Sequence, residues 1–408
     1  MKVINRRQKG AVSLFVVIFC ALFIVTIATA FIRIMLQDQM QATANDLSKS
    51  ALDSAYAGVE DAKRAIVEYY TDQTMTTGKP NCATVEENQN SRCDELRSAL
   101  FATVATNDGW TNDCQATVDA KVASLSDGEV PVKTGTDNSL NQAYTCLKIQ
   151  MNPADFVDKI ASDKSQVIHL KSLGGAKFDR IKIQWLLAEQ KDNSTLDNAS
   201  PYVLPDTWPT GRPPIIKAQL LQYKPNFHLS DFDSDNNYNA SLFLLPSTIG
   251  ANTAVRTSFG LDFRQNRESG AAQLVNCKDT PPSSRYACEV TIELPNWGDP
   301  STIGERDAYL KLTQFYKETA TDFRVTLIDS SSGSEQEVRF AGDVQPAVDA
   351  TGRANDIFRR IRSRINLGAS SVPVAESAVD VTKSLCKEFT VTNDRAYPGT
   401  SGVCPPLP

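Results

Sequence analysis

A long apolar run, followed by apolar and small residues at helical spacing, dominates the first seventy residues. Residues 11–32 form an apolar run of 22 residues without a charge, which spans about 33 Å as a helix and is long enough to cross a bilayer. The pattern continues without a proline to Tyr70, with apolar or small residues at steps of three and four. This stripe comprises Met40, Ala44, Leu47, Ala51, Ala55, Val59, Ala62 and Ile66. We therefore expect one helix of about 60 residues, with a transmembrane half, 11–36, and an amphipathic half, 37–70, whose stripe needs a partner.

The rest of the chain has a different pattern of polar and apolar residues. Residues 71–146 form a polar, cysteine-containing subdomain with a short helical pattern near 95–104. A β-rich head follows at 147–370, and a C-terminal disulfide loop and tail at 371–408. Alternation or short apolar runs predict strands at 144–151, 166–173, 180–188, 215–223, 240–246, 286–295, 308–315, 323–329 and 357–365. The expected class is α+β, with the long helix packed on a mainly antiparallel, sandwich-like head.

Charge is distributed unevenly and predicts the orientation in the membrane. Residues 1–10 contain four basic residues and no acid, while the remaining 38 basic and 48 acidic residues give the body a charge of −10. The basic leader should stay in the cytoplasm and the body should be exported. A cleaved secretory signal is the alternative, but the apolar run is too long for it and the helical pattern simply continues. An acidic body has no general attraction for nucleic acid.

Cysteine usage agrees with export. Cys20 lies in the membrane segment, and the other eight cysteines form an even set without a CxxC motif, which predicts disulfides rather than zinc. Pairing of sequence neighbours is the simplest of the 105 possible connectivities. It joins Cys82 to Cys93, Cys114 to Cys146, Cys277 to Cys288 and Cys386 to Cys404.

Few residues carry a chemical signal. Asp231, Asp233, Asp235 and Asn237 have the spacing that opens an EF-hand-type calcium loop. However, Asn236 replaces the glycine at the sixth position and Leu242 the glutamate at the twelfth, so the alternative is a solvated turn. Two histidines and no common catalytic motif argue against an enzyme. We expect no cofactor other than this possible calcium ion.

A basic cluster stands near residue 360 in an otherwise acidic chain. Its arginines are Arg353, Arg359, Arg360, Arg362 and Arg364. The cluster could contact DNA, anionic glycans or a neighbouring subunit. The interpretation that we favour is a solvated strand face paired with acids across the sheet. The four tryptophans could bind sugar but are more simply core or loop residues.

The N-terminus resembles a type IV prepilin, and most closely the PilX-type minor-pilin N-terminal family. The resemblance rests on RRQKGAVSLFVVIFCALFIVTIATAFIRIMLQ and the alanine-rich KSALDSAYAGVEDAKRA. It covers about the first 70 residues, and VDATGRANDIFRRIRSRI is loosely similar to a late strand in pilin-like proteins. The family implies cleavage by a prepilin peptidase between Gly10 and Ala11. It also implies assembly with other pilin subunits through the N-terminal helix.

One position departs from the family pattern. Many pilins have Glu as the fifth residue after the cut, and here that residue is Phe15, which favours a subunit at the tip or in initiation. Phe15, Arg360, Arg362 and Arg364 are the expected partner contacts. The expected function is a minor-pilin-like subunit of a type IV pilus or related fibre, first in the inner or cytoplasmic membrane and then at the cell surface. The alternatives are a single-pass anchored surface adhesin, with an unknown ligand, and a pseudopilin of a type II-like secretion system.

Overall fold

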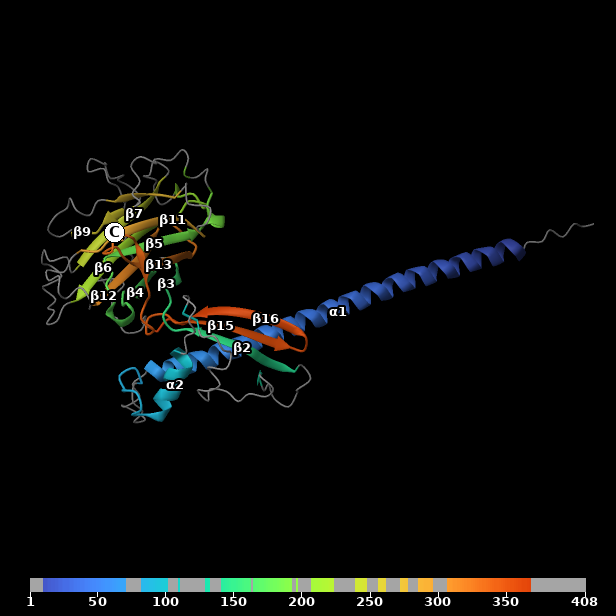
Figure 1. The fold of residues 1–408 in the computed structure, drawn as a ribbon. Coiled ribbons are helices and arrows are strands. Elements are labelled where there is room, and N and C mark those ends of the chain that lie inside the picture. Colours follow the sequence, from blue (N-terminus) through green and yellow to red (C-terminus); the bar gives the residue numbers. More distant parts are fainter. Residues whose placement is uncertain are drawn as a thin grey trace, which may run out of the picture. The chain divides into compact units, whose positions relative to one another are not determined.

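A computed structural model gives the fold of the chain. It describes residues 10–70, 82–101, 109–110, 129–132, 141–162, 164–192, 196, 207–223, 239–247, 256–261, 272–277, 285–295 and 307–367. The helices are α1 (Gly10–Tyr70) and α2 (Ser91–Phe101), with short 3-10 turns η1 (Leu173–Gly175) and η2 (Ala188–Gln190). The fold is α+β, as the sequence predicts, and α1 is the expected single long helix (Figure 1).

The strands follow in chain order and most coincide with the predicted ones. They are β1 (Val130–Pro131), β2 (Gln142–Gln150), β3 (Asp155–Ile160), β4 (Ser165–His169), β5 (Arg180–Leu187), β6 (Ile215–Tyr223), β7 (Asn239–Ser247), β8 (Arg256–Ser258), β9 (Gly260–Leu261), β10 (Gln273–Asn276), β11 (Tyr286–Glu293), β12 (Asp307–Phe315), β13 (Thr321–Asp329), β14 (Gln336–Val338), β15 (Ala347–Ala354) and β16 (Ile357–Arg364).

The chain divides into two compact units, neither of them continuous in sequence. The first contains residues 1–66, 113–148 and 349–362, and the second contains 67–112, 149–348 and 363–408. The 71–146 segment, expected from sequence as one subdomain, therefore contributes α2 to the second unit and β1 with most of β2 to the first.

The first unit is built from α1 and a four-stranded sheet. The sheet order is β1-β2-β15-β16, and Figure 1 shows β2, β15 and β16 alongside the C-terminal part of α1. A two-residue turn joins β15 to β16, and Asn355 takes a φ of 48° in it, a left-handed conformation that asparagine tolerates. The sheet that receives the amphipathic half-helix is thus separate from the two sheets of the second unit, and it takes β15 and β16 from the segment expected as the β-rich head.

The second unit is a β-sandwich. One sheet has the order β10-β7-β6-β12-β4, with β9 paired to β7, and the other has the order β14-β13-β5-β11-β8, with β3 paired to β13. All the described pairings in the two sheets are antiparallel except β10 with β7 and β11 with β8. Both sheets contribute to one buried core that includes Trp185, Phe323, Leu310 and Leu244. This burial is the main source of stability that the sandwich has.

Two of the predicted disulfides are present. Cys277, directly after β10, bonds to Cys288 in β11, so it connects the two sheets of the sandwich. Cys82 bonds to Cys93 in α2, with 5.0 Å between their Cα atoms. Cys20 is a free, exposed cysteine. Cys114, Cys386 and Cys404 lie outside the described residues, as does the side chain of Cys146.

Candidate functional site

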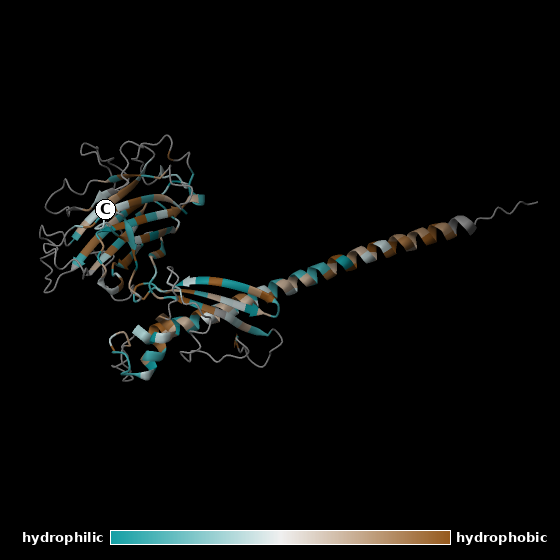
Figure 2. Ribbon diagram, viewed as in Figure 1, coloured by the Kyte–Doolittle hydropathy of each residue, from teal (hydrophilic) through white to brown (hydrophobic). Residues whose placement is uncertain are grey.

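The N-terminal half of α1 presents an uncovered apolar surface. Large apolar side chains from Leu14 to Leu36 are more than half exposed, and Phe15 reaches 77%. Figure 2 shows this half as a nearly continuous hydrophobic stretch that gives way to mixed residues further along. By length and composition α1 can cross a membrane, and an apolar surface of this extent needs lipid or another protein to cover it.

The C-terminal half of α1 buries its stripe of small residues within the first unit. Ala51, Ala55, Ala62 and Ile66 are each fully buried, and Val59 nearly so. At Gly352 in β15, an added methyl group would lie 2.8 Å from the carbonyl carbon of Ser54 and closer still to backbone atoms of Ala51 and Ala55. The sheet therefore approaches the helix so closely at this point that no side chain fits at position 352, which requires glycine there.

A hydrogen bond fixes the helix on the sheet. The hydroxyl of Tyr144 in β2 donates to a carboxylate oxygen of Asp61 at 2.9 Å. The ring of Tyr144 lies against Gly58, where an added methyl group would be 3.1 Å from a ring carbon. Burial, and then the nearby charge of Asp61, raise the pKa of Tyr144, so the hydroxyl stays protonated and remains a donor.

The predicted stripe is longer than the part that the sheet covers. Met40 and Ala44 are exposed and Leu47 is half-buried, whereas burial becomes complete at Ala51. The reason is the extent of the sheet, whose contacts with α1 begin near Ser48, a residue that accepts a hydrogen bond from Arg359 at 2.7 Å. Met40 and Ala44, which lie beyond the transmembrane half, 11–36, are therefore not covered by the sheet.

Three of the four arginines of β16 are paired with acids, the arrangement favoured from sequence, while Arg359 donates a hydrogen bond to Ser48. Arg360 and Arg362 both bind the carboxylate of Asp349 in β15, at 2.6 and 3.1 Å. Arg364 binds Asp155 at 2.5 Å, and Arg353 binds Glu129. Burial alone would raise the pKa of Asp349, but hydrogen bonds from the two arginines outweigh it and lower that pKa. One carboxylate for two guanidinium groups leaves this strand pair positive, and Phe358 beside them is 54% exposed.

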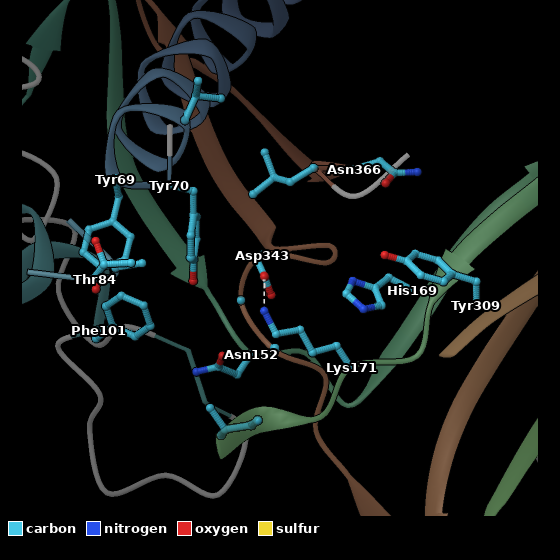
Figure 3. Close-up of a pocket in the computed structure, with 16 residues that line it drawn as sticks. Tyr69, Tyr70, Thr84, Phe101, Asn152, His169, Lys171, Tyr309, Asp343 and Asn366 are labelled. Carbon is cyan, nitrogen blue, oxygen red and sulfur yellow. Dashed lines mark hydrogen bonds and ion pairs between the residues drawn. The ribbon is translucent and has the colours of Figure 1, made fainter. Parts of the chain in front are cut away.

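A pocket of about 910 Å³ opens in the second unit. Its walls come from the last turn of α1, the segment before α2, the end of β4 and the loop around Asp343. Figure 3 shows Tyr69, Tyr70 and Phe101 on one side, and His169 with Tyr309 on the other. These residues come from distant parts of the sequence, so no single motif predicts the pocket.

Aromatic packing and one ion pair shape the pocket. His169 and Tyr309 are partners across β4 and β12, and their rings stack with centroids 4.5 Å apart. Between the two aromatic sides, Lys171 forms an ion pair with Asp343. Burial, and then the charge of Asp343, raise the pKa of Tyr70, which keeps its hydroxyl available as a donor.

The positions of the other predicted site residues divide into two groups. Gly10 and Ala11 lie in the first turn of α1, and Phe15 lies on its exposed surface. The candidate calcium residues Asp231, Asp233, Asp235 and Asn237 lie outside the described residues. Within the described ranges, no group of three or more His, Cys, Asp or Glu side chains is arranged to hold a metal ion. Trp185 is fully buried in the core, as the packing interpretation expects.

Comparison with known proteins gives no relative. No family model matches the sequence, and no curated protein or solved structure matches the chain.

Proposed function

We propose that the chain is a minor-pilin-like structural subunit of a type IV pilus or a related cell-surface fibre. In this proposal it is made as a single-pass membrane precursor and processed between Gly10 and Ala11. The observation that carries the proposal is the division of α1 into two halves with different surroundings. One half is apolar and exposed, and the other buries its stripe of small residues, from Ala51 onward, on a sheet of the same chain.

A simple membrane tether does not need this arrangement. Residues after a tether's membrane span can be any soluble spacer, and a small-residue stripe in close contact with a sheet serves no purpose there. A fibre subunit needs a rigid connection, because its apolar half-helix must leave lipid and pack in a fibre core while the body stays outside. The hydrogen bond from Tyr144 to Asp61 and the close approach at Gly352 support such a connection.

The uncovered part of the stripe supports the same proposal. Met40 is 64% exposed and lies beyond the transmembrane half, 11–36. In an isolated anchored protein, water would surround its side chain. Burial of Met40 and Ala44 against the helices of neighbouring subunits removes this apolar surface from water. Phe15 in place of the usual glutamate supports a place at the tip or in initiation, because no carboxylate is then available to pair with a neighbour's amine.

Processing gives the decisive experiment. The wild type, Gly10→Val and the control Asn5→Val are expressed in a cell with a prepilin peptidase, and intact masses are measured from membranes and from sheared surface fibres. We expect the wild type and the control to lack residues 1–10 and Gly10→Val to retain them. Equal masses for wild type and Gly10→Val contradict the proposal.

The distribution of the processed protein separates the alternatives. A mature chain beginning at Ala11 in the sheared fibres supports the fibre subunit. An uncut chain that stays in the membrane supports the anchored surface adhesin. A cut chain that never reaches the sheared fraction supports a pseudopilin of a secretion system.

A further inference from the structure

We propose that the pocket of the second unit binds a neutral saccharide, with the stacked His169–Tyr309 pair as one wall. This function is separate from assembly, because a processed subunit and a plain anchored protein can both present the pocket. Its volume of about 910 Å³ lies in the range of small-molecule sites.

The charge of the pocket favours a neutral ligand. Its permanent charges among the described lining residues are Lys171 and Asp343, which pair with each other. An anionic ligand would have to compete with the carboxylate for the ammonium group, and a cationic ligand would have to compete with the ammonium group for the carboxylate. Neither gains a free counter-charge, so ionic recognition is weak here.

The remaining lining suits the two surfaces of a sugar ring. Aromatic side chains stand on both sides of the pocket (Figure 3), and the flat C–H face of a pyranose packs on such rings as other apolar groups do. Sugar hydroxyls both donate and accept hydrogen bonds. The amides of Asn152 and Asn366 and the hydroxyl of Tyr70, which also line the pocket, supply both kinds of partner.

The shape is set by the protein before any ligand arrives. His169 and Tyr309 are held by the backbone pairing of β4 and β12. Tyr69 is buried and contacts both Tyr70 and Phe101, with ring centroids 5.0 and 5.3 Å away. Arg92 in α2 binds Glu68 at 3.0 Å, so α2 is tied to the end of α1 beside the pocket. A preformed wall lowers the ordering cost of binding.

The test uses the full-length protein in a zwitterionic detergent without sugar groups. The probes are lactose, cellobiose, maltose and chitobiose as neutral saccharides, with 3′-sialyllactose and adenosine monophosphate as anionic comparisons. Saturation-transfer NMR with titration gives the dissociation constants. We expect at least one neutral saccharide to bind saturably, and Tyr309→Ala to weaken it about tenfold.

Two further variants keep the test decisive. Ala83→Arg places a long side chain at an exposed position of the lining, so it should reduce binding even if Tyr309→Ala fails to fold. Tyr56→Ala removes an exposed tyrosine of α1 outside the pocket and should leave the dissociation constant unchanged. Binding of no neutral saccharide overturns the proposal, as does equal binding by wild type and Ala83→Arg, or tighter binding of the anionic probes. None of these outcomes depends on processing after Gly10.

Discussion

Gly352 is a residue of β15 at which the backbone of α1 leaves no room for a side chain. An added methyl group there meets the backbone of Ala51, Ser54 and Ala55, and backbone atoms cannot move aside as a flexible side chain can. We expect Gly352→Ala to destabilise the first unit by about 3 kcal/mol or more, measured by thermal melting of the full-length protein in micelles.

Gly58→Ala is the matched control for this prediction. Its methyl group would lie 3.1 Å from the Tyr144 ring and 3.4 Å from Ala350, so small shifts accommodate it, and alanine improves helix propensity by about 1 kcal/mol. The control should change stability far less than Gly352→Ala. Equal losses of stability in the two variants would show that position 352 has no special need for glycine.

Ala55 tests the burial of the stripe itself. Ala55→Asp places a carboxylate at a fully buried position, which should cost several kcal/mol or force protonation of the new side chain. Asp53→Ala changes an exposed residue two positions earlier and should cost about 0.5 kcal/mol or less. If Ala55→Asp melts with the wild type, the helix is a free stalk and the anchored-adhesin alternative gains.

Between neighbouring elements, the hairpin of β15 and β16 depends on one carboxylate. Asp349 is buried and ionised, and its two arginines lower its pKa below the ordinary value of about 4. Because the pKa is lower in the folded state, the ion pairs of Asp349 stabilise the fold fully above about pH 4. That stabilisation is lost as the pH falls through the folded-state pKa.

Melting between pH 7 and pH 3 checks this dependence. Asp349→Asn should be less stable than the wild type at pH 7, because an amide does not carry the charge that two arginines bind. Below pH 4 the wild type should lose stability faster than the variant, so the two curves converge. Parallel curves over this range would exclude Asp349 as the titrating group.

Periodicity was sufficient to predict elements that bury one continuous face. The α1 stripe and strands such as Ile215–Tyr223 follow from it, since their apolar residues recur regularly over nine residues or more. The strand β3 (Asp155–Ile160) was missed because its six residues contain three charges, and the four-residue β10 is too short for a pattern to show.

Tertiary placement was predictable only where sequence neighbours meet. The Cys82–Cys93 and Cys277–Cys288 bonds each span 11 residues, so proximity along the chain predicted them. The His169–Tyr309 stack joins residues far apart in sequence, and it follows from a strand register that no local pattern fixes. For the same reason the sequence did not separate the sheet under α1 from the sheets of the sandwich.

At the scale of the whole molecule, each unit has its own core. The first is organised around the buried stripe of α1, and the second around the sandwich core, where Cys277–Cys288 joins the sheets. We expect calorimetry of the full-length protein to show two transitions. Ala55→Asp should lower the temperature of one transition. The double change Cys277→Ala and Cys288→Ala should lower the temperature of the other, because loss of a disulfide that closes a loop of this length reduces the free energy of unfolding by about 3 kcal/mol. A single transition that both sets of changes lower would show that the units unfold together.

The path of the chain between the units has a mechanical consequence. Within the described residues it passes from one unit to the other at Ile66–Val67, Lys148–Ile149, Val348–Asp349 and Arg362–Ser363. A domain that is joined by a single linker is lost after one proteolytic cut, and any force on that domain passes through one covalent connection. Here a cut at Lys148–Ile149 leaves two fragments that each contribute elements to both units, so the second unit stays attached until one of the units unfolds. A pull on the second unit is likewise shared among several covalent connections, so no single linker carries the whole force.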